Sequence, residues 1–201
     1  MTRPTIKQRI RSSSLPPLIA AILSLPPCAA CGYETGPEKP AISPASGNLI
    51  PNGSFEQNGQ ATLETWQVTN SALASLVPDP APGGGKWSLR LQADGAPTTG
   101  QVKFLVPGLK DGDVVRLSAQ VRAASEGGGG FVGLETTAAD GRIRHQSFTS
   151  TANPAWTLVS VTETLALESA DQVWVVLRSP DTELQARAGL FDLVTLERLS
   201  R

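Results

Sequence analysis

VVRLSAQVRA, residues 114–123, is the stretch that decides the fold class. Apolar and polar side chains alternate over most of its length. A period of two is typical of a β-strand with one buried face, because successive side chains of a strand point to opposite sides of the sheet. The stretch therefore predicts a strand that buries its valine, leucine and alanine side chains and turns outward Arg116, Ser118, Gln120 and Arg122.

Shorter runs of the same kind lie on both sides of this strand. They cover Trp87 to Leu91, Val102 to Val106, Val132 to Thr136, Thr157 to Val161 and Val173 to Leu177. Asp140-Gly141 predicts a hairpin, since both central residues of such a turn take positive φ. No segment has an apolar repeat of 3.6 residues flanked by helix caps. Many short strands predict an all-β protein, a single antiparallel β-sandwich of the jelly-roll kind.

The first 30 residues have the layout of a secretory signal peptide. Four basic residues and no acidic one precede an apolar stretch, Leu15 to Pro27, which is too short and too rich in proline to span a bilayer. The segment CAAC, residues 28–31, then resembles a bacterial lipobox, which implies cleavage before Cys31 and lipidation of that cysteine. We therefore expect an exported protein, lipid-anchored to a cell-envelope membrane such as the outer membrane or the cell surface. Secretion without an anchor is the alternative.

Residues 31–47 are expected to form the lipidated cysteine and a flexible spacer, because they are rich in Pro, Gly and Ser and have no periodic apolar pattern. Residues 48–201 form the predicted sandwich. Beyond residue 30 the chain carries 13 basic and 18 acidic residues, a net charge of −5. A nucleic-acid partner requires a basic face, so we expect none. No cysteine follows Cys31, so the domain must fold without disulfides.

The segment NLIPNGSFE, residues 48–56, opens this domain, and FDLVTLE, residues 191–197, closes it. Between them Trp66, the strand GKWSL at 85–89, Pro107-Gly108 and Trp156 follow in order. In this order and spacing, residues 48–198 resemble carbohydrate-binding modules of families 4, 9 and 22. The resemblance implies the galactose-binding-like β-sandwich and non-catalytic binding of a polysaccharide or oligosaccharide. A structural or protein-interaction lipoprotein without a glycan site is the alternative, because a fold does not fix a function.

The same resemblance implies a structural calcium ion shared by the first and last strands. By position, its side-chain ligands are Glu56 and Asp192; Leu193 stands where a second aspartate is usual. Ca²⁺ takes six to eight oxygen ligands, so two carboxylates and loop carbonyls suit it. The alternative is that Glu56 caps a turn and Asp192 accepts backbone hydrogen bonds.

A glycan site needs an aromatic face for the sugar C–H groups and polar side chains for its hydroxyls. Trp66, Trp87 and Trp156 are expected to be structural. Trp174 differs, because Val173, Val175 and Leu177 take the opposite face of their strand. Outward residues of neighbouring strands are expected beside it, and the predicted ligand-binding residues are Trp174, Gln120, Arg122, Glu135 and Arg178. Alternatively, a loop covers Trp174 and the charged residues form a solvated face.

Catalytic motifs are lacking in this sequence. His145 is the single histidine, and no Gly-x-Ser-x-Gly or His-x-x-x-His pattern occurs. The segment GGGK, residues 83–86, lacks the hydroxyl residue and the first glycine of a phosphate-binding loop. We therefore predict that the protein is not an enzyme.

Overall fold

The computed structural model describes residues 47–94, 99–180 and 187–199. Apart from a short 3-10 helix, η1 (Ser71–Leu73), every regular element described is a β-strand. The all-β prediction is therefore confirmed. No helix within these ranges is long and apolar enough to cross a membrane. The predicted signal peptide, Cys31 and the spacer up to residue 46 lie outside the described residues.

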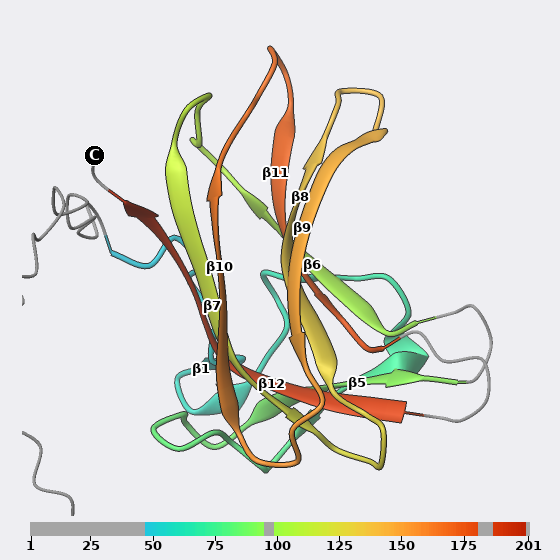
Figure 1. Cartoon of the computed structure of the whole chain (residues 1–201). Helices are drawn as coiled ribbons and strands as arrows, with labels where there is room; N and C mark the ends of the chain where they lie inside the picture. The colour runs from blue at the N-terminus through green and yellow to red at the C-terminus, as the bar shows by residue number, and fades with distance from the viewer. Residues whose placement is uncertain (1–46, 95–98, 181–186, 200–201) are drawn as a thin grey trace, which may run out of the picture. The chain divides into compact units, whose positions relative to one another are not determined.

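Two five-stranded antiparallel sheets form the sandwich (Figure 1). The first, here called the β7 sheet, has the order β10 (Thr157–Thr164), β7 (Val114–Ala123), β12 (Arg187–Leu199), β5 (Ser88–Ala93), β4 (Ala74–Val77). The second, the β11 sheet, has the order β3 (Gln67–Val68), β6 (Gln101–Val106), β11 (Gln172–Arg178), β8 (Gly130–Thr137), β9 (Ile143–Thr151). A third, two-stranded sheet consists of β1 (Glu56–Gln57) and β2 (Gln60–Ala61).

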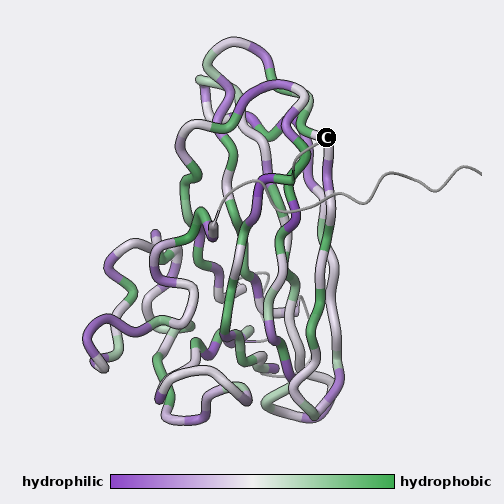
Figure 2. The backbone as a smooth tube through the Cα atoms, turned by 90° about the vertical axis from the view of Figure 1, so that its left-hand side faces the viewer, coloured by the Kyte–Doolittle hydropathy of each residue, from purple (hydrophilic) through white to green (hydrophobic). Residues whose placement is uncertain are grey.

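The alternation seen in the sequence sets the two layers. Hydrophobic and hydrophilic residues alternate along the strands (Figure 2). On β7, Val115, Leu117, Ala119 and Val121 are fully buried, and on β11 the fully or almost fully buried side chains include Val175 and Leu177. Burial of these faces between the sheets is the main source of stability in a domain without disulfides, at roughly 25 cal/mol per Å² of apolar surface. The predicted sandwich is thus the observed one.

The hairpin predicted at Asp140-Gly141 connects β8 and β9. The detail of the turn was predicted wrongly, because only Gly141 of the pair has positive φ, at 82°. The carboxylate of Asp140 instead accepts a hydrogen bond from the backbone N–H of Arg142 at 3.0 Å. A register shift between Thr136 and Thr137 fits this turn to the strand ladder.

The opening and closing segments lie against each other. The N–H of Leu49 donates to the carbonyl of Leu196, and the N–H of Val194 donates to the carbonyl of Gly53, both at 2.8 Å. A Cβ on Gly53 would lie 1.8 Å from the carbonyl oxygen of Val194, so only glycine allows this approach. The opening and closing segments of the domain are therefore held together without a disulfide between them.

Trp66 packs in the core beside the opening segment. Its ring lies between Phe55 and Phe104, with centroids 5.5 and 5.7 Å away, and its Nε1 donates to the carbonyl of Asn52 at 3.0 Å. Trp66 is 5% exposed, so the structural role predicted for it is confirmed.

Candidate functional site

Trp174 lies at the centre of the outer face of the β11 sheet. Its strand pairs with β6 and β8, and Trp174 stands opposite Leu105 on one side and Glu135 on the other. The indole is half-buried, and its Nε1 donates to the hydroxyl of Thr137 at 3.1 Å. This hydrogen bond fixes the polar edge of the ring, which leaves an oriented aromatic surface on the sheet.

The carboxylate of Glu135 is held beside Trp174 by two neighbours. Glu135 is 3% exposed; the ammonium of Lys103 lies 2.6 Å from its Oε1, and the amide of Gln146 donates to its Oε2 at 2.8 Å. A buried charge is tolerated when it is paired and hydrogen-bonded. Lys103, Glu135 and Gln146 therefore form a row of polar side chains across β6, β8 and β9, in which the charges of Lys103 and Glu135 cancel.

A hollow of about 280 Å³ lies over this row. It is lined by Gln67, Lys103, Glu135, Thr137, Gly141, Ile143, Gln172 and Trp174. Two exposed apolar side chains lie nearby: Ile143 in the lining, 50% exposed, and Leu105 opposite Trp174, 39% exposed. An aromatic ring, apolar surface and several hydrogen-bonding groups are the composition that a neutral sugar needs.

Arg178 shares this outer face but not the hollow. It lies four residues along β11 from Trp174, about 13 Å at the usual strand rise. Its guanidinium is stacked over the rings of Phe131 and Phe148, 5.2 and 5.4 Å from their centroids. The β11 face thus carries two clusters, of which the one at Trp174 is open.

The placement predicted for Gln120 and Arg122 beside Trp174 is wrong. Both residues lie on β7, which pairs with β10 and β12 in the other sheet. Alternation along a strand gives the face of each side chain relative to its own sheet, but not the sheet to which the strand belongs. Arg122 instead lies over the ring of Trp156, 5.4 Å from its centroid, and forms an ion pair with Asp79.

Several residues of the hollow escaped the sequence analysis. Lys103 and Gln67 come from β6 and β3 and line the hollow, whereas Gln146 comes from β9 and binds Glu135 without lining the hollow. Each meets the site only through strand pairing. The alternation of the run Val102 to Val106 already turned Lys103 away from the core. The missing information was the order of the strands.

Glu56 and Asp192 converge on the segment that precedes β5. Oε1 of Glu56 accepts hydrogen bonds from the backbone N–H of Lys86 and, at 2.6 Å, of Trp87. Asp192 is fully buried; its Oδ2 accepts from the N–H of Ala81 at 2.9 Å and its Oδ1 from its neighbour Leu193 at 2.7 Å. These bonds are the ones that the capping alternative requires.

Burial raises the pKa of Asp192, and the negative charge of Glu56 acts in the same direction, against the two backbone hydrogen bonds. A Cβ on Gly84 would lie 2.1 Å from Oδ2 of Asp192, and one on Gly85 would lie 2.2 Å from Oε2 of Glu56. The glycine loop therefore packs directly on both carboxylates. Two mutually repelling carboxylates in one partly buried place fit a hard cation, which prefers oxygen ligands. Within the described ranges no group of three His, Cys, Asp or Glu side chains adds to this pair.

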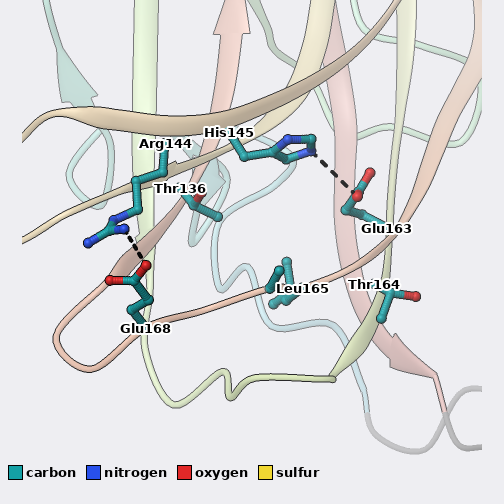
Figure 3. A pocket seen from close by; sticks show the side chains of 8 residues that line it. Thr136, Arg144, His145, Glu163, Thr164, Leu165 and Glu168 are labelled. Atoms are coloured by element: carbon teal, nitrogen blue, oxygen red, sulfur yellow. Dashed lines mark ion pairs between the residues drawn. The ribbon is translucent and has the colours of Figure 1, made fainter.

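A further hollow, of about 290 Å³, lies where the edges of the two sheets meet, beside β9 and β10 (Figure 3). Nε2 of His145 is 3.5 Å from Oε1 of Glu163, and Arg144 lies 2.6 Å from Glu168 and 3.0 Å from Asp171. Each of these acids thus faces a basic group from β9. The contact of His145 with Glu163 connects β9 with β10, and Arg144 connects β9 with the loop after β10, which gives His145 a structural role.

The fold and the aromatic face around Trp174 are those expected of a carbohydrate-binding module, a class that is generally non-catalytic. A family model described as a carbohydrate binding domain matches residues 47–183, and the chain belongs to this family. No curated protein matches the chain.

Solved structures of such modules share the fold. A family 16 carbohydrate binding module-2 is 23% identical with a TM-score of 0.55, over 74% of this chain and 99% of that one. TmCBM61, in complex with β-1,4-galactotriose, is 17% identical with a TM-score of 0.52, over 76% and 99%. The CBM22-1 xylan-binding domain of Paenibacillus barcinonensis Xyn10C is 15% identical with a TM-score of 0.53, over 71% and 91%.

Proposed function

We propose that this protein binds a neutral glycan chain, without catalysis, in the hollow around Trp174. The observation that carries the proposal is the composition of that hollow: an oriented indole beside exposed apolar side chains and paired polar groups. The sugar's C–H face packs on the ring of Trp174, and its hydroxyls bind the side chains around Glu135. Similar folds that bind galactotriose and xylan support a polysaccharide ligand.

Binding is tested by affinity electrophoresis of the whole exported chain in gels that contain galactan, xylan or β-glucan. We expect retardation by at least one polymer and its loss in Trp174→Ala. The matched control is Leu158→Ala, which truncates a side chain that is 65% exposed on the other sheet. No retardation by any polymer, or equal retardation of Trp174→Ala and the wild type, would contradict the proposal.

The protein is further proposed to be exported and anchored to the cell envelope by a lipid on Cys31. The basic start, the apolar stretch and the CAAC segment support this. The spacer then separates the module from the membrane surface. A Cys31→Ala variant should move from the detergent phase to the aqueous phase on detergent partitioning. If the variant remained in the detergent phase, lipidation of Cys31 would be excluded.

Finally, we propose that Glu56 and Asp192 hold a structural Ca²⁺. Two carboxylates packed under a glycine loop, with the pKa of Asp192 raised by burial and by the charge of Glu56, support a cation there. When bound, the ion supplies positive charge that offsets this repulsion. Glu56 lies at the end of the opening segment and Asp192 lies on β12, and both contact the loop that precedes β5. An ion bound to both would therefore hold these three segments together and stabilise the fold.

A further inference from the structure

Two arginines and one aspartate lie together on the outer face of the β7 sheet. Arg122 on β7 and Arg90 on β5 are both opposite Leu190 of the strand between them. Neighbouring strands are about 4.8 Å apart, which places the two Cα atoms about 10 Å from each other. Both arginines and Asp79 line one hollow of about 280 Å³.

The charges in this hollow do not balance. Asp79 forms its ion pair with Arg122, while Arg90 has no ion pair with any carboxylate of the described residues. The Nε atoms of both arginines are buried and have no hydrogen-bond partner in the part of the chain that the structure describes. A guanidinium is always charged, so two guanidinium groups beside one carboxylate leave excess positive charge in the hollow, which favours an anion there.

Arg122 is also oriented for recognition. The ring of Trp156 supports its guanidinium, and Asp79, half exposed to solvent at 48%, is its counter-ion. Arg122 also lines a second and larger hollow of about 530 Å³, formed with Ser125, Glu126, Gly127 and Pro154. An anion that bound between the arginines would have space beside Arg122 for the rest of its molecule.

We propose that Arg90 and Arg122 form a second binding site, separate from the Trp174 hollow, for the carboxylate or sulfate group of an acidic saccharide. A planar, multidentate guanidinium suits both groups. The larger hollow takes the sugar to which the acidic group is attached, and Asp79 occupies Arg122 until the ligand displaces it. The saccharide part rests on the proposed function, whereas the oxyanion site stands on the arginines alone.

The test measures retardation of the whole exported chain by polygalacturonate, by a sulfated galactan and by a neutral galactan. We expect Arg90→Gln and Arg122→Gln to weaken binding to at least one acidic polymer by about tenfold or more, and to leave neutral binding unchanged. Trp174→Ala should do the reverse, so the two sites succeed or fail separately. Lys110→Gln, which removes an exposed charge elsewhere, is the control for diffuse attraction.

Asp79→Asn provides a variant that gains binding. Removal of the competing carboxylate should strengthen binding to the acidic polymer about threefold, the size of a partly exposed ion pair. An ion pair with only a structural role would lower the melting temperature without any gain. The proposal is overturned if neither acidic polymer binds, if Lys110→Gln weakens binding as much as Arg90→Gln, or if millimolar sodium sulfate displaces the polymer completely, which would indicate a site for a free ion.

Discussion

The outer faces of the two sheets are built from similar residue types but differ in how charge is neutralised. On the β11 face the buried carboxylate of Glu135 is satisfied by Lys103 and Gln146, and the indole of Trp174 stays available. On the β7 face Trp156 supports Arg122, and Arg122 and Arg90 line one hollow with a single carboxylate, that of Asp79, which pairs with Arg122. One scaffold therefore offers a neutral aromatic surface on one side and a cationic hollow on the other.

The largest expected effect tests the buried ion pair of the β11 face. Lys103→Met leaves the carboxylate of Glu135, 3% exposed, without its cation. The free energy of unfolding should fall by about 3 kcal/mol, as for other broken buried pairs. Asp79→Asn on the β7 face removes a partly exposed partner and should cost less than about 1 kcal/mol. Urea unfolding measures both; equal losses would mean that the two faces hold their charges in the same way.

The next effect is that of calcium at Glu56 and Asp192, whose carboxylates lie against the glycine loop before β5. Excess calcium should raise the free energy of unfolding of chelator-treated protein by about 2.7 kcal/mol at a hundredfold excess over Kd. Asp192→Asn should abolish this gain. An unchanged melting temperature of the wild type on addition of calcium would remove the metal proposal and leave the capping alternative.

The pH dependence gives an independent test of the same pair. Burial raises the pKa of Asp192, so its contribution to metal-free stability is present below the ordinary value of 3.8 and is lost as pH rises through the raised pKa. In chelator, the stability of the wild type relative to Asp192→Asn should therefore fall with rising pH. In calcium the trend should reverse, because the ion binds the deprotonated carboxylate. Thermal melts at several pH values measure the difference.

A smaller effect is expected from the exposed apolar residues of the β11 face. Leu105→Ser and Ile143→Ser should each weaken binding of the neutral glycan by about fivefold, or about 1 kcal/mol of lost apolar contact. Leu158→Ser, at the most exposed apolar position of the β7 sheet, is the matched control and should change nothing. Calorimetric titration with the polymer found by electrophoresis measures all three. A loss in Leu158→Ser alone would move the neutral site to the other sheet.

The difference between the faces also marks how far the sequence is informative. Alternation predicted the observed bounds of β7 and turned Trp174, Glu135 and Arg178 outward, and the structure places all three on one sheet. It could not place Gln120 and Arg122, because strand order depends on pairings between distant segments that a period of two does not encode. Lys103 was missed for the same reason. The approach of Glu56 to Asp192 was expected only from the family resemblance, since nothing local connects the two.

The smallest expected effect is that of salt, and it separates the two faces without any mutation. Charge interactions at a partly exposed site are screened as the Debye length falls from about 10 Å at 0.1 M salt to about 3 Å at 1 M. Binding of an acidic saccharide at Arg90 and Arg122 should weaken severalfold over this range. Binding of a neutral glycan at Trp174 should hold constant, because stacking and hydrogen bonds to a paired carboxylate carry no net charge. Equal salt dependence for both ligands would mean that the cationic hollow, and not the indole, binds both.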